Sequence, residues 1–263
     1  MHPTELLRQA RLKEHPLEPL SGGQMGQVWR AGPYVIKTHP NPPAGMFQAE
    51  ARGLFALSQA GIRVPEVYWA SSDGLVMEYL PPGEPDWEKL ARMLAGMHKL
   101  RPPTYGWDDR VFLGSFELPS GTHPGWQTFW IEKRIQPLLE ATWKQLGPLG
   151  PRVEALLGQP LPLEGPALIH GDLWQGNVLA AKGGPALLDP SVWWGERAVD
   201  LAMMTLFGGL PAGFWKLYRV LYPIPPEIER ALPRYQIYYL LVHVYFFGSS
   251  YLPLLLRTLE AAT

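Results

Sequence analysis

Three oxygen-bearing side chains stand close together in the sequence. Asp172 and Asn177 lie in the stretch LIHGDLWQGNVLA, and Asp189 follows in ALLDP. Phosphoryl transfer from ATP needs a carboxylate that orients or deprotonates the acceptor hydroxyl. It also needs hard oxygen ligands for Mg²⁺, which neutralises charge on the phosphates. An Asp, an Asn five residues later and an Asp on a neighbouring strand supply this set.

The spacing of Asp172 and Asn177 is the spacing found in the catalytic loop of protein kinases. The alternative is a polar turn in which both side chains bind local backbone groups. His170, two residues before Asp172, is expected to brace this loop rather than to act as a base.

A lysine and a glutamate nearer the N-terminus favour the catalytic interpretation. Lys37 ends the strand-like run YVIKT, where a cation is costly without a partner. Glu50, on the next predicted helix, can be that partner, and the pair would hold the lysine against the α- and β-phosphates. The alternatives are a Lys37 that reaches solvent and a Glu50 on a solvated helix face.

Two further segments fit a nucleotide site. Gly22 and Gly23, in SGGQMG, allow a sharp turn that offers backbone N–H groups to phosphates, although the segment departs from G-x-G-x-x-G and is also compatible with a hairpin turn. In VMEYLPPG, the C=O of Glu78 and the N–H of Leu80 are placed to read adenine, with Met77 behind it.

These residues occur in the order that a two-lobed kinase requires: glycine-rich turn, Lys, Glu, hinge, Asp, Asn, Asp. Other chemistry finds little support. The seven histidines form no H-x-x-x-H pair, so no zinc site is expected, and there is no G-x-S-x-G nucleophile elbow.

The elements that must position these residues indicate an α+β fold of two lobes. Residues 1–80 read as a small, antiparallel, β-rich N-lobe, 81–86 as a proline-rich hinge, and 87–263 as a larger, mainly helical C-lobe. We expect the helix in GMFQAEARGLFALSQAG to end at Gly61, and Pro137 to kink or interrupt the helix in GWQTFWIEKRIQPLLEATWKQL.

Composition narrows the class of protein. The formal net charge of −1 gives no reason to expect nucleic acid as a partner. The chain has no cysteine, and its N-terminus reads as an amphipathic helix rather than a signal peptide, so we expect a cytoplasmic protein. The most apolar segment, YYLLVHVYFFGSSYLPLLL, is interrupted by polar residues and indicates a buried helix pair rather than a membrane span. The oligomeric state stays open.

The motifs HGDLWQGN, LLDPSVWWGERAVDLAM and LFGG, with GWQTFWIEKRIQPLL, resemble the fructosamine kinase (ketosamine-3-kinase) family. The resemblance covers about residues 17–256. That family has the protein-kinase-like fold and is related to the aminoglycoside phosphotransferases. HGDxxxxN alone is shared with choline, homoserine and aminoglycoside kinases, whereas GDLWQGN joined to DPSVWWGERAVDLAM is more specific.

The resemblance implies a role for each matching residue. Asp172 would be the catalytic base, Asn177 and Asp189 would bind Mg²⁺, Lys37 would contact the ATP phosphates with Glu50 as its partner, and Asp200 would stiffen the catalytic loop by accepting backbone N–H bonds. The residues that would line the acceptor pocket are Trp174, Trp193, Trp194, Glu196 and Arg197. Trp126 and Trp130 are additional candidates for this lining.

The sequence departs from the family at the pocket and at the phosphate loop. Gln175 replaces a small residue, Trp193 and Trp194 replace paired tyrosines, and the absence of cysteine excludes thiol-based control.

The resemblance implies ATP-dependent phosphorylation of the hydroxyl on the third sugar carbon of ketoamines, free or on protein lysines, which releases the amine. The alternatives are a kinase of aminoglycoside-like or amino-alcohol acceptors and an inactive nucleotide-binding module, although an inactive relative need keep none of Asp172, Asn177, Asp189 and Lys37.

Overall fold

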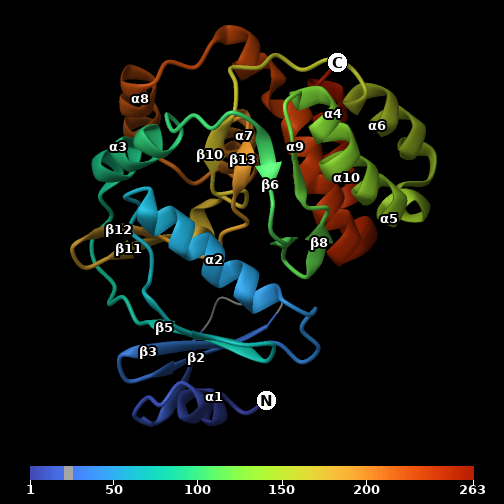
Figure 1. Ribbon diagram of the computed structural model, residues 1–263. Helices are drawn as coiled ribbons and strands as arrows, with labels where there is room; N and C mark the ends of the chain where they lie inside the picture. Colours follow the sequence, from blue (N-terminus) through green and yellow to red (C-terminus); the bar gives the residue numbers. More distant parts are fainter. Residues whose placement is uncertain (21–25) are drawn as a thin grey trace.

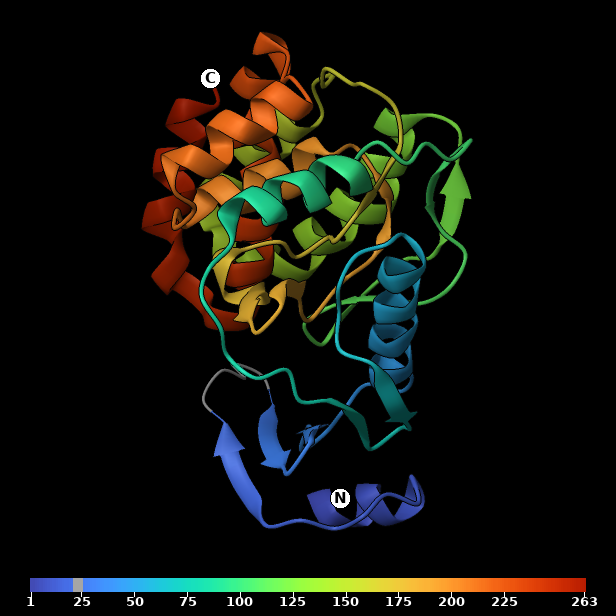
Figure 2. The ribbon, with the colours of Figure 1, turned by 90° about the vertical axis from the view of Figure 1, so that its left-hand side faces the viewer.

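The protein consists of two lobes, a small one built on an antiparallel sheet and a larger, mainly helical one (Figures 1 and 2). The computed structural model describes residues 1–20 and 26–263. Gly22 and Gly23 of the predicted phosphate loop lie outside the described residues. The five strands of the small lobe run in the order β1-β2-β3-β5-β4. Their bounds are β1 Leu17–Leu20, β2 Gln27–Ala31, β3 Tyr34–Thr38, β4 Val67–Ala70 and β5 Gly74–Glu78.

A helix covers each face of this sheet. α1 (Pro3–Gln9) buries Leu6 and Leu7 against one face, and α2 (Met46–Gln59) buries Phe47 and Leu54 against the other (Figure 1). The alternation of side chains along a strand makes this possible, because successive residues point to opposite faces. α2 stands between the sheet and the larger lobe, so its outer face is available to a site between the lobes (Figure 2).

The larger lobe is organised around the long helix α9 (Pro226–Phe247), which packs on α5, α7 and α10. Half of its residues are buried, which explains the apolar sequence. By length and composition the helical stretch 226–261 could cross a membrane, yet the first part of it forms the centre of this lobe. The other helices are α3 Trp87–Met97, α4 Trp126–Trp130, α5 Gln136–Leu146, α6 Gly150–Leu157, α7 Ala198–Leu206, α8 Ala212–Leu221 and α10 Leu252–Ala261.

Pro137 interrupts the helix around it, as expected, and does so through a π-helical segment, Ile131–Ile135, between α4 and α5. Proline has no N–H for the carbonyl four residues earlier and its ring crowds that carbonyl. The carbonyl in question, that of Lys133, accepts a hydrogen bond from Nη1 of Arg134 at 2.8 Å.

The larger lobe also contains short strands, and the sequence patterns revealed only those beside the Asp172 loop and before Asp189. Four of them form a sheet in the order β10-β13-β6-β9, and two further hairpins are β7–β8 and β11–β12. Most have only three residues, too few for a periodic pattern to be visible. Their bounds are β6 Tyr105–Trp107, β7 Val111–Leu113, β8 Phe116–Leu118, β9 Gly121–His123, β10 Ala167–Ile169, β11 Val178–Ala181, β12 Gly184–Leu187 and β13 Trp193–Gly195.

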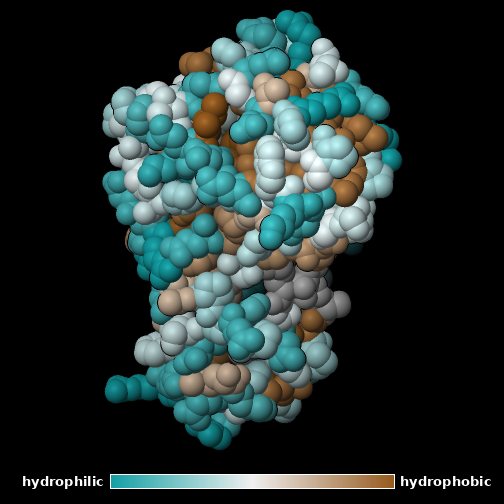
Figure 3. Space-filling model, turned by 90° about the vertical axis from the view of Figure 1, so that its right-hand side faces the viewer, coloured by the Kyte–Doolittle hydropathy of each residue, from teal (hydrophilic) through white to brown (hydrophobic). Residues whose placement is uncertain are grey.

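The connection between the lobes, residues 79–86, is held by the β11–β12 hairpin of the larger lobe. The N–H of Gly83 donates to the carbonyl of Ala180, and the N–H of Lys182 donates to the carbonyl of Pro81, both at 2.8 Å. α3 begins directly afterwards, with the side chain of Asp86 accepting from the N–H of Lys89. Figure 3 shows the two lobes meeting at a narrower waist.

Candidate active site

The loop that carries Asp172 is fixed from behind by buried polar side chains. Asp200, on α7, accepts the N–H groups of His170 and Gly171 at 2.8 and 2.9 Å. The hydroxyl of Tyr239, on α9, donates to the carbonyl of Gly171 at 2.8 Å. Gly171 has a φ of +80°, and a Cβ there would lie 2.0 Å from the carbonyl oxygen of Ser191, so this turn accepts glycine alone without rearrangement.

His170 joins the Asp172 loop to the segment that carries Asp189. Its Nδ1 accepts the N–H of Asp172 at 3.2 Å, so its proton is on Nε2, which donates to the carbonyl of Leu188 at 2.9 Å. Burial lowers the pKa of His170, which keeps the ring neutral and suits this bridging role.

Asp172 is held by its partner in the motif. Nδ2 of Asn177 donates to the backbone carbonyl of Asp172 at 2.8 Å and to its Oδ2 at 3.2 Å. The second carboxylate oxygen, Oδ1, is therefore left for another partner. Burial, with a contribution from Asp189, raises the pKa of Asp172 to about 7. A carboxylate in this range accepts a proton more readily than an exposed one.

Asp189 has a left-handed backbone conformation, with φ at +54°. This conformation is uncommon outside glycine, although Asp and Asn tolerate it best, and it often marks functional sites. Asp189 lies two residues after the end of β12, and the N–H of the intervening Leu188 donates to the carbonyl of Asn177 at 2.9 Å. The backbone thus brings the Asn177 and Asp189 segments together.

Lys37 pairs with two carboxylates. Its Nζ lies 2.5 Å from Oε1 of Glu50, on α2, and also pairs with Oδ1 of Asp189. Burial lowers the pKa of Lys37, but the two carboxylates more than offset that effect and raise it, so the ammonium stays charged. Burial raises the pKa of Glu50, opposed by Lys37. A lysine held in this way presents a fixed positive charge between the lobes.

The donor set fits a Mg²⁺–nucleotide complex. Because Nδ2 of Asn177 donates to Asp172, its Oδ1 and the Asp189 carboxylate are the hard oxygens available to a cation. No cluster of three or more His, Asp or Glu side chains suited to a metal exists within residues 1–20 and 26–263. This agrees with Mg²⁺ chemistry, since Mg²⁺ is usually held by one or two protein groups with phosphates and water completing its shell.

The predicted adenine-reading segment lies where β5 leaves the sheet. Met77 is buried against α2, and the N–H groups of Glu78 and Tyr79 donate to carbonyls of the small lobe. The N–H of Leu80 has no acceptor within the described part of the chain. The Leu80 side chain packs with Leu179 of β11, which supplies an apolar surface beside this free donor.

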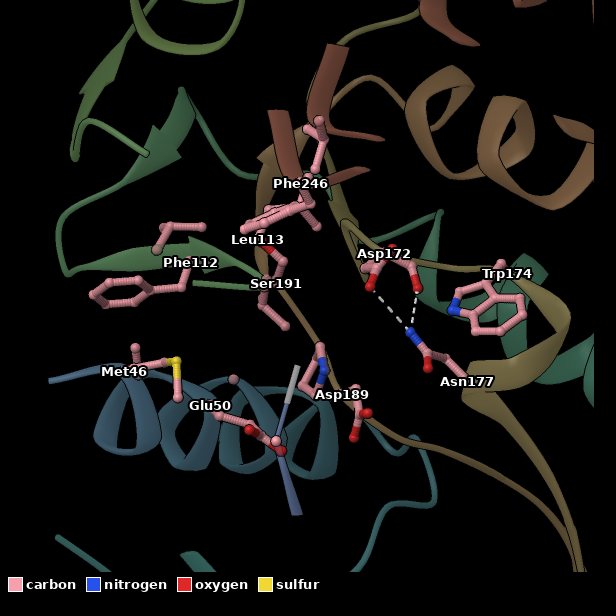
Figure 4. A pocket seen from close by; sticks show the side chains of 18 of the residues that line it. Met46, Glu50, Phe112, Leu113, Asp172, Trp174, Asn177, Asp189, Ser191 and Phe246 are labelled. Atoms are coloured by element: carbon pink, nitrogen blue, oxygen red, sulfur yellow. Dashed lines mark hydrogen bonds between the residues drawn. The ribbon is translucent and has the colours of Figure 1, made fainter. Parts of the chain in front are cut away.

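A cavity of about 330 Å³ lies between the lobes, and its described lining contains the candidate catalytic residues but not Met77, Glu78 or Leu80. Lys37 and Glu50 line it from the small lobe, and Asp172, Asn177 and Asp189 line it from the larger one. In Figure 4, Asp172 and Asn177 face each other across their hydrogen bonds, with Glu50 and Met46 on α2 below and Phe246 on the opposite side. Trp174 also lines the cavity, and its indole covers Gly176, where a Cβ would lie 2.3 Å from the ring.

Trp193 lies in the core and not at the cavity, contrary to expectation. Its side chain is fully buried and stacks on Trp126, which in turn stacks on Trp130. The reason is β13, which pairs with β10 and turns Trp193 inward, whereas Trp194 is half-buried against Trp107. These indoles build the larger lobe, and of the predicted acceptor tryptophans the cavity lining contains Trp174.

Glu196 and Arg197 are likewise structural in this geometry rather than part of the cavity lining. Glu196 is buried and accepts hydrogen bonds from the Tyr105 hydroxyl at 2.6 Å and from the N–H groups of Glu164 and Gly165. Arg197 is buried and binds both carboxylate oxygens of Glu164 at 2.7 Å. Glu196 is paired with Tyr105 and the loop before β10, and Arg197 also donates to the Tyr218 hydroxyl and to the Tyr222 carbonyl, which explains charged residues in a buried position.

The cavity is lined at its other end by aromatic residues that sequence reasoning missed. They come from the end of α7, the C-terminal part of α9, the following 3₁₀ turn and the β7 strand: Phe207, His243, Phe246, Phe247, Tyr251 and Phe112. A signal was present for two of them, because positions 243 and 247 are four residues apart and share one face of α9, whereas Tyr251 follows in the 3₁₀ turn. The contact of this face with the catalytic loop depends on the tertiary fold.

The fold and site define a class, the protein-kinase-like phosphotransferases. An aminoglycoside phosphotransferase in complex with gentamicin has a TM-score of 0.67 at 14% identity, covering 98% of this chain and 96% of that one, which shows the shared fold. A "putative fructosamine-3-kinase" from Thermobifida fusca is more similar, with a TM-score of 0.87 at 30% identity over 99% of this chain and 97% of that one.

The family model described as fructosamine kinase matches residues 4–262, and the chain belongs to that family. A probable ketoamine kinase of Thermus thermophilus is 56% identical over 263 residues, covering 100% of both chains. A probable ketoamine kinase of Enterococcus faecium is 36% identical over 250 residues, covering 89% of this chain and 90% of the relative. The resemblance inferred from the motifs and the kinase-like fold are thus confirmed.

Proposed function

We propose that the protein transfers the γ-phosphoryl group of ATP to the 3-hydroxyl of the sugar in ketoamines, such as fructosamine or ribulosamine adducts of lysine, and so promotes release of the amine. The observation that carries the kinase part is the meeting of Asp172, Asn177 and Asp189 with the Lys37–Glu50 pair in one cavity. Family membership and the names of the relatives support ketoamines as acceptors.

In this mechanism Asp172 orients the acceptor hydroxyl and takes its proton. The hydroxyl oxygen forms a bond to the γ-phosphorus as the bond from that phosphorus to the bridging oxygen breaks, and ADP leaves. Lys37, held by Glu50, neutralises charge on the phosphates. Mg²⁺ held by Asn177 and Asp189 would supply further charge neutralisation.

Asp200 and His170 contribute by keeping the loop rigid, since both bind its backbone from the buried side. Leu80 and Glu78 offer the backbone groups that would bind adenine. A rigid site of this kind reduces the reorganisation needed at the moment of transfer.

The acceptor class is tested by direct phosphate transfer. The protein is incubated with Mg·ATP and either a ribulose– or fructose–lysine adduct or a kanamycin-like aminoglycoside, and products are followed by mass spectrometry. Aminoglycosides are polycations, and the aromatic residues at the end of this cavity away from Lys37 suit a ketoamine better. Transfer to aminoglycosides with none to ketoamines would contradict the proposal, and absence of ATP turnover with any acceptor would indicate a binding module.

A further inference from the structure

The cavity continues beyond the catalytic loop into a group of rings that we call the aromatic cluster, Phe207, His243, Phe247 and Tyr251. The ring centroid of His243 lies 5.0 Å from that of Phe207 and 4.7 Å from that of Tyr251, and the Phe247 and Tyr251 centroids are 5.6 Å apart. Phe207 and Phe247 keep 42% and 39% of their surface exposed, so ring faces remain available to a ligand.

The aromatic cluster is connected to the loop of Asp172 through α9. On α9, the Tyr239 hydroxyl binds the carbonyl of Gly171, the residue before Asp172. His243 follows four residues later on the same helix, a rise of about 6 Å. One helix therefore contacts the catalytic loop through Tyr239 and carries His243 and Phe247 of the cluster.

His243 supplies the cluster with a hydrogen-bond acceptor. Its Nδ1 lies 2.7 Å from the carbonyl oxygen of Tyr239, and because a carbonyl only accepts, Nδ1 carries the proton. Burial lowers the pKa of His243, so the ring is neutral near neutral pH. Nε2 then has a free lone pair, and within residues 1–20 and 26–263 no side chain or backbone group donates to it.

The charges along the cavity are unevenly distributed. The acids among its described lining residues are Glu50, Asp172 and Asp189, all at the end that holds Lys37 or the candidate base. The aromatic cluster contains no carboxylate. Ring faces attract cations through their quadrupole, and an unprotonated imidazole nitrogen accepts from an N–H group. A cluster of this composition suits one ammonium group rather than a polycation.

We propose that the aromatic cluster binds the protonated secondary amine of the ketoamine acceptor, with the cation against the exposed ring surfaces and Nε2 of His243 accepting its N–H. This inference rests on the proposed function and names the residues that select the acceptor. In a ketoamine the nitrogen lies only a few bonds from the 3-hydroxyl, which agrees with a cluster that lines the same cavity as Asp172.

The test compares two acceptors, a ketoamine and its N-acetyl derivative, which keeps the sugar and loses the positive charge. His243→Phe and Phe247→Leu should raise KM for the ketoamine about tenfold, the scale of a cation–π contact, and leave KM for ATP unchanged. KM for the N-acetyl derivative should not rise. His243→Gln, whose side-chain oxygen can replace Nε2, should keep most of the affinity.

Tyr245→Leu is the matched control, because Tyr245 lies on the same helix with 40% exposure and is not part of the cavity lining. Wild-type KM values in both His243→Phe and Phe247→Leu would overturn the inference, as would an equal rise for the two acceptors, which indicates lost shape rather than lost amine recognition. A wild-type protein that phosphorylates no ketoamine overturns the proposed function itself. The two failures are therefore distinguishable.

Discussion

Lys37 and Asp189 form an ion pair that joins the two lobes, from β3 of the small lobe to the segment after β12 in the larger one. The same Lys37 ammonium group also pairs with Glu50, so it binds one carboxylate from each lobe. In a nucleotide complex the phosphates compete for this cation. Asp189 is then the partner that can exchange it for a metal ion, whereas Glu50 keeps the lysine in place.

The Lys37–Glu50 pair should behave as a unit in kinetics. Lys37→Met and Glu50→Gln should each raise KM for ATP or lower kcat, and the double variant should lose less than the sum of the two effects, because residues in contact are not independent. The measurement is a double-mutant cycle on kcat/KM. Strictly additive losses would show that the two side chains do not cooperate. Arg52→Met, which breaks the more exposed pair with Asp109, serves as a control.

Replacing the candidate base should separate chemistry from nucleotide binding. Asp172→Asn keeps the size of the side chain and removes its ability to take a proton, so kcat should fall by about 10²-fold or more while the Kd for Mg·ATP changes little. Steady-state kinetics measure kcat, and titration with Mg·ATP measures the Kd. Asp108→Asn, at an exposed position, should leave both unchanged. Near wild-type turnover in Asp172→Asn would mean that the base lies elsewhere.

Removing a candidate metal ligand should affect binding itself. Asp189→Ala deletes one of the hard oxygens, so calorimetric titration with Mg·ATP should show weaker binding and the Mg²⁺-dependent activity should be lost. Asp189→Ala also frees Lys37 from one partner, so titration with ATP in the absence of Mg²⁺ is the appropriate comparison. Unchanged metal-dependent binding would move the metal site away from Asp189.

His243 should make stability depend on pH. Burial lowers its pKa in the folded state, whereas in the unfolded state the pKa is about 6.5. Below about pH 6.5 the unfolded chain therefore binds more protons, and the free energy of unfolding falls as pH falls towards the folded pKa. Urea unfolding of wild type and His243→Gln at about pH 7 and about pH 5 should show a smaller loss in the variant. An equal loss of unfolding free energy in the two proteins would contradict a lowered pKa of His243 in the folded state.

The sequence predicted the parts of the site that rest on local spacing. Asp172 and Asn177 share one loop, and the strand that ends in Lys37 and the helix that carries Glu50 are both visible from side-chain patterns. The interruption at Pro137 was also predictable, because the lost N–H is a property of proline itself.

The acceptor side could not be predicted in the same way. Trp193 was expected at the pocket, but the three-residue strand β13 turns it into the core, and such a short strand leaves no readable period. Glu196 and Arg197 are charged and looked available, yet Tyr105 and Glu164, distant in sequence, bind them. Phe247 enters the cavity only because α9 crosses behind the catalytic loop.

The connection between the lobes has a practical consequence for cutting and grafting the chain. Residues 81–86 are exposed and rich in proline, which is the usual appearance of a loose tether, yet Pro81 and Gly83 are paired with the β11–β12 hairpin. The tether is thus an additional edge of the larger lobe, and proteases that require a freely extended substrate should cleave it slowly. A chimaera that exchanges small lobes between relatives would best be joined before Leu80, so that this edge stays with the hairpin that it matches.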